Sequence, residues 1–197
     1  MTHHLKAGDL LLIVDPQNDF MPGGALSVKE GDQIIPVLNR WIAAAQKMQI
    51  PIVVSRDWHP PHHISFQERG GKWPVHCVRD TPGADFHPDL HLPRETIIVD
   101  KATEKDTEAY SAFEGVTHDT GVPLLDKLRE FHIARVWIMG LTLDYCVYYS
   151  AIDAAKQGFE FHVVLPGCRA IAADTAEKAL AHMRQMGGVI LEEEEQI

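Results

Sequence analysis

The chain has 197 residues and a mass of 22.1 kDa, enough to bury a full hydrophobic core and typical of one domain. Its formal net charge of −10 gives no electrostatic support for a nucleic-acid partner, and no apolar run approaches the length of a membrane span. Three cysteines without a regular framework, and no recognisable signal segment, favour a reducing compartment, so we expect a cytoplasmic protein.

Apolar runs alternate with amphipathic patterns along the whole chain. The apolar runs predict buried strands at residues 10–14, 52–54, 97–99, 136–139, 161–165 and 189–191. The amphipathic patterns predict helices at residues 32–48, 122–132, 145–157 and 174–186, the first with Asp32 as its N-cap. This alternation predicts a single three-layer α/β/α domain over residues 1–197, with a mainly parallel sheet of about six strands and helices on both faces.

One irregular stretch, about residues 56–95, is too long to be a simple connection between elements. It contains Asp57, His59, His63 and His76 in a segment rich in proline and glycine. Asp and His side chains are good ligands for zinc, manganese or iron. Because the chain has 12 histidines, a solvated His-rich loop is the alternative interpretation. The stretch alone favours a metal site only slightly.

Polar residues that can carry out chemistry follow successive predicted strands. Asp15 ends the first strand, Asp57 follows the second, Lys101 follows the third, and Cys146 comes shortly after the fourth. In open α/β sheets, ligands bind outside the carboxyl ends of the strands. We therefore expect these four side chains to meet at one edge of the sheet.

Cys146 lies just inside the predicted N-terminus of the helix at residues 145–157. The helix dipole stabilises a thiolate there and predicts a lowered thiol pKa, and a nearby Lys101 would act in the same direction. Asp15 could accept the thiol proton, and unpaired N–H groups around Thr142 and Cys146 could receive an oxyanion. The alternative is a buried, unreactive cysteine, and position alone leaves both interpretations open.

Several short motifs occur in a fixed order from about residue 10 to residue 173. They are DPQNDF at 15–20, DWHP at 57–60, HISF at 63–66, WPVHC at 73–77, Lys101, YSAF at 110–113 and DYCV at 144–147. Each motif alone is weak, but the ordered set is specific. Together they resemble the nicotinamidase/pyrazinamidase branch of the isochorismatase-like cysteine hydrolases.

The resemblance implies an Asp-Lys-Cys catalytic triad, which falls on Asp15, Lys101 and Cys146. It also implies an oxyanion hole made by the backbone N–H groups of Thr142 and Cys146, beside a cis peptide between Leu141 and Thr142. Thr142 and the following Leu143 stand where smaller or polar residues are common in the family. The shape of the pocket near them is therefore left open.

A bound divalent metal ion is the second implication of the resemblance. Zinc is the preferred candidate, with iron or manganese as alternatives, and no organic cofactor is expected. The ligands fall on Asp57, His59 and His76, with His63 a further ligand in some members and His62 facing solvent. The substrate ring is expected to stack among aromatic side chains, which fall on Phe20 and Trp73, with Tyr110 nearby.

The implied activity is hydrolysis of nicotinamide, and also of pyrazinamide, through a thioester acyl-enzyme in NAD salvage. A dimer or tetramer is the expectation by analogy with the family. The alternatives are a sister amidase acting on ureidoacrylate or carbamoyl substrates and a metal-binding protein without activity. The second alternative gives no reason for Asp15, Lys101 and Cys146 at successive strand ends, and a redox protein is disfavoured because no Cys-x-x-Cys pair is present.

Overall fold

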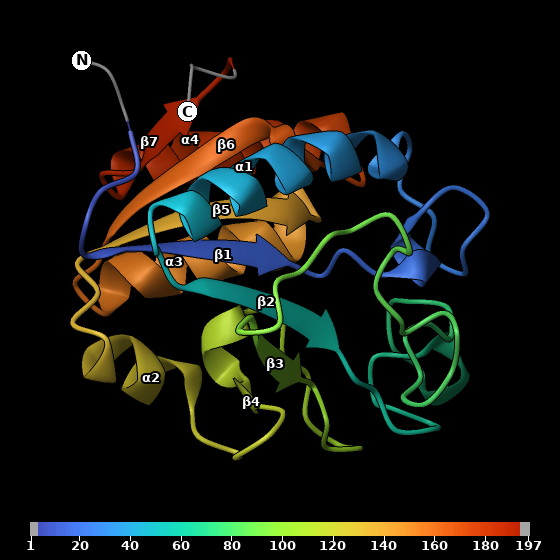
Figure 1. Cartoon of the computed structure of the whole chain (residues 1–197). Coiled ribbons are helices and arrows are strands. Elements are labelled where there is room, and N and C mark those ends of the chain that lie inside the picture. The colour runs from blue at the N-terminus through green and yellow to red at the C-terminus, as the bar shows by residue number, and fades with distance from the viewer. Residues whose placement is uncertain (1–3, 194–197) are drawn as a thin grey trace.

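The computed structural model describes residues 4–193. Its strands form one seven-stranded sheet in the order β4-β3-β2-β1-β5-β6-β7 (Figure 1). Every neighbouring pair is parallel except β3 and β4. The strands are β1 (Asp9–Val14), β2 (Ile52–Asp57), β3 (Ile97–Lys101), β4 (Val116–Thr117), β5 (Arg135–Leu141), β6 (Glu160–Arg169) and β7 (Val189–Leu191). The predicted α/β class and all six predicted strands are confirmed, and the edge strand β4 was missed because it has only two residues.

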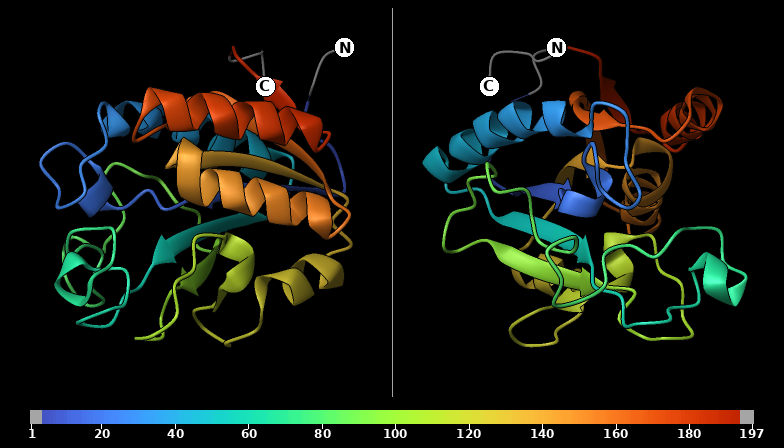
Figure 2. Two further views of the ribbon diagram at one scale, coloured as in Figure 1. Left: turned by 180° about the vertical axis from the view of Figure 1, so that it is seen from behind. Right: turned by 90° about the vertical axis from the view of Figure 1, so that its right-hand side faces the viewer.

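Helices cover both faces of the sheet, as predicted. They are α1 (Ile35–Lys47), α2 (Leu124–Glu130), α3 (Tyr148–Lys156) and α4 (Ala173–Gln185). Helix α1 lies on one face and the other three lie on the opposite face (Figures 1 and 2). On the first face, Trp41 of α1 packs against Trp137 of β5 with ring centroids 5.0 Å apart. Among the described residues, no helix is long and apolar enough to cross a membrane.

The start of α1 differs from the prediction. A 3₁₀ turn (Gly31–Ile34) precedes the helix, and the N-cap residue is Ile34 without a side-chain capping bond. The prediction that Asp32 caps this helix is therefore wrong, because the 3₁₀ turn places Asp32 inside the first turn of the helical segment. Pro36 stands in the first turn of α1 and has no N–H group, so fewer donors need a cap there.

The two central strands approach each other closely at their carboxyl ends. Val14 of β1 pairs with Gly140 of β5, and a Cβ atom on Gly140 would lie 2.1 Å from the Val14 carbonyl oxygen. Gly140 also has φ = +130°, a conformation that side chains rarely allow. Glycine at this position therefore lets β1 and β5 deliver Asp15 and Thr142 to the same region.

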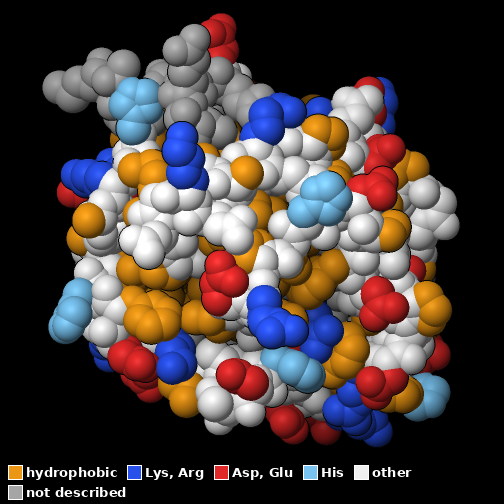
Figure 3. All heavy atoms as spheres, in the orientation of Figure 1, with side chains coloured by type: hydrophobic (Ala, Val, Ile, Leu, Met, Phe, Trp, Pro, Cys, Tyr) orange, Lys and Arg blue, Asp and Glu red, His pale blue; other side chains and the backbone are white. Residues whose placement is uncertain are grey.

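The long loops gather at the carboxyl edge of the parallel strands. The arrowheads of β1 and β2 point toward the segments that follow them, residues 15–30 and 58–95 (Figure 1; Figure 2, right). On the face drawn in Figure 3, the coloured Lys and Arg side chains are scattered among acidic and apolar ones and form no continuous basic band.

Candidate active site

Four side chains from separate segments meet at the carboxyl edge of the sheet, with the ammonium of Lys101 at their centre. Lys101 Nζ lies 2.8 Å from Asp15 Oδ2 and 3.4 Å from Cys146 Sγ, and it also donates to Asp57 Oδ1. Asp15 is fully buried, Lys101 is 1% exposed and Cys146 is 6% exposed. The structure thus brings together the four residues predicted from the strand ends, and it shows that Lys101 contacts Asp57 as well as Asp15.

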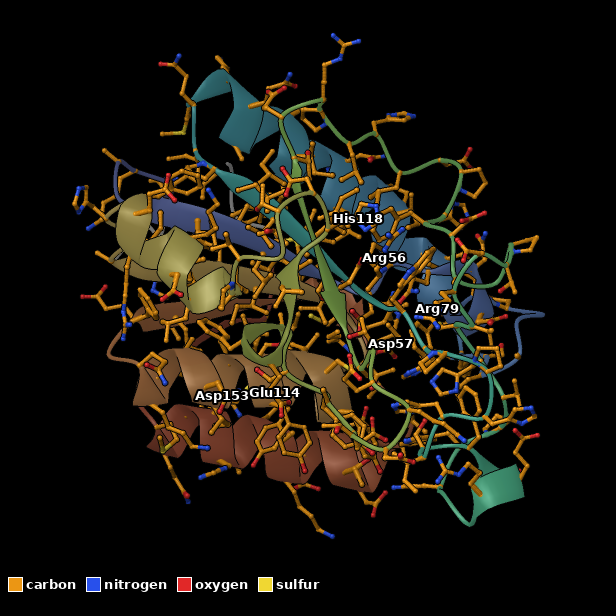
Figure 4. All side chains as sticks on the ribbon, turned by 90° about the horizontal axis from the view of Figure 1, so that it is seen from below. Arg56, Asp57, Arg79, Glu114, His118 and Asp153 are labelled. Atoms are coloured by element: carbon orange, nitrogen blue, oxygen red, sulfur yellow. The ribbon has the colours of Figure 1, made fainter. Side chains whose placement is uncertain are left out.

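The register between β2 and β3 makes this arrangement. Asp57 pairs with Lys101, and the preceding residues Arg56 and Asp100 pair in the same register. Because side chains alternate between the faces of a strand, Arg56 points the other way. There its Nε donates to Asp100 Oδ1 at 2.6 Å, next to the ring of His118 (Figure 4). A one-residue slip would separate both ion pairs.

Asp15 sits in a strained backbone position directly after β1. Its φ is +49°, which turns the side chain out of the strand and toward Lys101. Ser55 Oγ of β2 donates to Asp15 Oδ1 at 2.8 Å. Burial raises the pKa of Asp15 above its ordinary value, Lys101 opposes this, and Asp57 adds to it. Ser55 was not predicted as a site residue. Its position directly after the apolar run at residues 52–54 could have indicated it.

Lys101 and Asp57 are both held in their charged forms. Burial alone would lower the pKa of Lys101, but the carboxylates of Asp15 and Asp57 outweigh it and raise that pKa well above its ordinary value. Burial alone would raise the pKa of Asp57, but Lys101 and His59 hold it well below its usual range. The ammonium of Lys101 therefore lies beside two carboxyl groups whose pKa values are shifted in opposite directions, upward at Asp15 and downward at Asp57.

Cys146 lies in a π-helical turn (Leu143–Val147) that leads into α3. Burial raises its pKa well above the ordinary thiol value; Lys101 opposes this shift, while Asp15 and Asp57 reinforce it. The prediction of a lowered thiol pKa at this helix start is therefore wrong, because burial beside two carboxylates outweighs the opposing effect of Lys101. The hydrogen bond between Cys146 and Asp15 provides the route by which the thiol can lose its proton.

Asp57, His59 and His76 form a three-residue group suited to a metal ion, with ligand atoms all within 4.8 Å of one another. The Nε2 atoms of His59 and His76 lie 3.6 Å and 3.8 Å from Asp57 Oδ2. The Nδ1–H group of His59 donates to the Ala102 carbonyl at 3.2 Å, and that of His76 donates to the Pro74 carbonyl at 2.7 Å. Each Nε2 atom is therefore unprotonated and has a lone pair free for a metal ion. His59 Nε2 is buried without a hydrogen-bond partner, as expected for a ligand atom. The donor set therefore fits a divalent cation.

His63 lies beside this group but is bonded elsewhere. The Ser65 N–H donates to His63 Nδ1 at 3.3 Å, so the proton is on Nε2, which donates to the Thr107 carbonyl at 2.9 Å. The His63 ring stacks on His59 with centroids 4.2 Å apart. In this geometry His63 orients His59 and directs no free lone pair at the metal group. The neighbouring His62 is exposed, as predicted.

A pocket opens above Cys146 and the metal group, and the three predicted aromatic side chains line it. Trp73 Nε1 donates to the Tyr110 hydroxyl at 3.0 Å, and Phe20 packs against His76 with centroids 5.7 Å apart. The full lining is Phe20, Leu26, Asp57, His59, Ser65, Trp73, His76, Glu108, Ala109, Tyr110, Thr142, Tyr145, Cys146 and Ile171.

Tyr145 and Glu108 are among the six lining residues that were not predicted as site residues; the other four are Leu26, Ser65, Ala109 and Ile171. Tyr145 packs edge-on against Trp73 at 5.0 Å, and its position beside Cys146 in the DYCV motif was an available signal. Glu108 could not be predicted from the sequence, because it follows a run of polar residues that is typical of a solvated loop. Burial raises the pKa of Glu108, and the charge of Asp57 adds to the shift.

The peptide bond between Leu141 and Thr142 is cis, as the resemblance implied. Thr142 precedes the π-helical turn, and its carbonyl accepts from the N–H groups of Tyr145 and Val147, each at 3.1 Å. Thr142 and Cys146 both line the pocket. The predicted oxyanion residues therefore lie at one wall of the cavity.

The sequence and the fold of this chain are similar to those of known proteins. The profile described as "Isochorismatase domain" matches residues 9–195. The chain belongs to the isochorismatase domain family. This confirms the family that the ordered motifs predicted.

Within this family, the chain is similar to proteins described as nicotinamidases. The nicotinamidase of Acinetobacter baylyi is 38% identical over 177 residues, which cover 82% of this chain and 81% of that protein. A crystal structure of the pyrazinamidase of Pyrococcus horikoshii in complex with zinc is 47% identical, with a TM-score of 0.87 over 93% of this chain and 98% of that one. PnC1 from L. infantum in complex with nicotinate is 33% identical, with a TM-score of 0.83 over 94% and 92%.

Replacing Lys101 with methionine should strongly destabilise the fold. The change leaves Asp15 and Asp57 buried beside each other without a cation, which should lower the free energy of unfolding by about 3–5 kcal/mol. Urea unfolding at neutral pH measures this. Lys156→Met, which breaks an exposed pair with Asp153, is the control and should cost less than about 1 kcal/mol. Equal losses in the two variants would show that Lys101 does not balance these acids.

Proposed function

We propose that this protein is a nicotinamidase, which hydrolyses nicotinamide to nicotinic acid and ammonia and accepts pyrazinamide as well. The observation that carries the proposal is the contact of a buried thiol, acid and ammonium beside a metal-binding group, under a small aromatic pocket. The similarity to nicotinamidases over most of the chain supports the same activity. The reaction contributes to NAD salvage, and the working compartment we propose is the cytoplasm.

The pocket suits a small planar ring with one polar substituent. It encloses about 350 Å³ of space between atoms, part of it open to solvent. Phe20, Trp73 and Tyr110 provide apolar faces for the ring, and Cys146 lies at the wall where the amide group would rest.

The chemistry begins with proton transfer from Cys146 to Asp15. The sulfur then attacks the carboxamide carbon, the C=O π bond opens, and the oxygen takes up negative charge facing the backbone amides of Thr142 and Cys146. Asp15 passes its proton to the amide nitrogen as the C–N bond breaks, because NH₂⁻ is too poor a leaving group. Ammonia leaves and a thioester remains on Cys146.

Water completes the cycle. Asp15, again a carboxylate, takes a proton from the water that attacks the thioester carbon, and returns it to the sulfur as the S–C bond breaks. Lys101 stays charged throughout, because the two carboxylates raise its pKa. Its role is to keep Asp15 ionised beside a sulfur that alternates between thiol and thiolate.

Zinc is the ion we propose for the group formed by Asp57, His59 and His76. One carboxylate and two imidazoles suit zinc, and three protein ligands leave coordination positions open. When bound, the ion supplies a Lewis acid that can hold the ring nitrogen, directly or through water, and so position the amide. We leave His63 outside this ligand set, because its ring nitrogens are both hydrogen-bonded elsewhere.

Removing the nucleophile tests the proposed activity directly. Cys146→Ala should lower the rate of ammonia release from nicotinamide by roughly 10⁴-fold or more, because no other cysteine among the described residues lines the pocket. Bound zinc should be unchanged, since Cys146 lies outside the three-ligand group. Cys168→Ala, on strand β6, is the matched control and should remain active. Wild-type turnover of ureidoacrylate or a carbamoyl substrate in preference to nicotinamide would instead support a sister amidase.

The metal site is tested by the two histidines. His59→Ala and His76→Ala should each weaken zinc binding by at least about 100-fold, because loss of a ligand exceeds the effect of losing an outer partner. Zinc content after dialysis and the rate of nicotinamide hydrolysis should fall together. His62→Ala removes an exposed ring from the same loop and should retain both. Full activity in metal-free protein would contradict a catalytic metal.

The decrease of kcat/KM at low pH should follow the protonation of Asp15. Asp15 must be a carboxylate to accept the thiol proton, and its pKa lies above the ordinary 3.8, so kcat/KM should fall with a midpoint above 3.8 as pH decreases. Lys101 remains charged well past neutrality, so it imposes no loss on the alkaline side below about pH 10. Zinc content measured at each pH separates this titration from loss of the ion. A midpoint at or below 3.8 would be inconsistent with Asp15 as the base.

A further inference from the structure

We infer that the side-chain hydroxyl of Thr142 donates a third hydrogen bond to the carbonyl oxygen of the bound amide, beside the two backbone donors of the oxyanion site. This inference rests on the proposed amidase function. It concerns the residue that stands where the resembled family commonly has a smaller one. The hydroxyl is a group that such a smaller side chain would lack.

The first observation is that the hydroxyl has nothing to bond to. Thr142 is 4% exposed, and its Oγ1 atom is buried without a hydrogen-bond partner. A buried polar atom in this state costs about 1–3 kcal/mol, and nearly all such atoms in native proteins are bonded. An arriving ligand is a direct explanation for tolerating this cost at a pocket wall.

The second observation excludes the usual local role of this residue type. Thr142 is the N-cap residue of the π-helical turn, where a threonine oxygen ordinarily accepts from an N–H group of the first turn. Its side chain makes no capping bond. The hydroxyl is thus not used to begin the helix, although it stands at the position where it could do so.

The third observation is the position of the hydroxyl relative to the reacting atoms. Thr142 lines the pocket together with Cys146, and its carbonyl is bonded to the N–H groups of Tyr145 and Val147, on either side of the nucleophile. Thr142 therefore contributes to the same pocket wall as the nucleophile. A donor at this point gains strength as the amide oxygen becomes negative.

Thr96 provides a contrast elsewhere in the fold. Its Oγ1 is also buried without a partner, but it borders a surface hollow with Arg94 and Glu95, away from Cys146. Lack of a partner is therefore not sufficient to identify a ligand contact. The position in the amide pocket distinguishes Thr142 from Thr96.

The test compares Thr142→Val, which deletes the hydroxyl with little change of shape, with Thr142→Ser, which keeps it. We expect Thr142→Val to lower kcat for nicotinamide about 10- to 100-fold with little change in KM, because two backbone donors remain. Its melting temperature should be equal or higher, since an unpartnered hydroxyl is replaced by a methyl group. Thr142→Ser should recover most of the rate, and Thr96→Val should be fully active.

Nicotinaldehyde gives a second readout. The thiol of Cys146 adds to the aldehyde carbon: the S–C bond forms, the C=O π bond opens, and the thiol proton passes to Asp15 or to the adduct oxygen. That oxygen occupies the place of the amide oxygen, so Thr142→Val should weaken inhibition by a factor similar to its loss in kcat. If the valine variant does not fold, Thr142→Ala makes the same deletion.

Two outcomes would overturn the inference. Wild-type kcat and aldehyde inhibition in Thr142→Val would show that the hydroxyl contributes nothing, and an equal loss in Thr142→Ser would assign the effect to packing. Either result leaves the nicotinamide turnover of the wild-type protein and the effect of Cys146→Ala intact. Failure of the proposed function would appear instead as a wild-type protein that does not hydrolyse nicotinamide.

Discussion

The buried ammonium of Lys101 is the interaction on which the whole site depends. Asp15 and Asp57 lie at the ends of neighbouring strands, and two carboxylates cannot both remain ionised in an interior without a cation between them. Lys101 contacts both, at the end of the adjacent strand β3. One acid can then serve as the base for Cys146 while the other holds a metal ion. The sheet register therefore couples two chemically separate tasks through one positive charge.

The two acids share this cation, yet their pKa values move in opposite directions. Burial dominates at Asp15 and raises its pKa, whereas Lys101, His59 and His76 outweigh burial at Asp57 and lower its pKa. Acids whose environments separate their pKa values commonly have separate roles. Asp15 is suited to accept and release a proton, and Asp57 is suited to remain an anionic ligand. This division follows from which neighbours each carboxylate contacts, since both start from the same side chain.

The sequence was sufficient to predict what depends on local pattern. Apolar runs predicted the six longer strands, and the residues that follow them predicted that Asp15, Asp57, Lys101 and Cys146 would meet. The pKa of Cys146 was predicted in the wrong direction, because the helix start is visible in sequence but burial beside two carboxylates is a tertiary property. The contact between Lys101 and Asp57 depends on strand register, which the sequence pattern alone did not specify.

Unsatisfied polar atoms gather at this site in a way that explains its chemistry. His59 Nε2 and Thr142 Oγ1 are both buried without a hydrogen-bond partner, and Asp15 Oδ2 is held by its ion pair with Lys101. Each would be costly in an ordinary core. Together they match what an amidase must accommodate: a proton in transit, a cation and a carbonyl oxygen that gains charge. The fold tolerates these atoms because sheet and helices fix them before the reactants arrive, so little reorganisation is needed during the reaction.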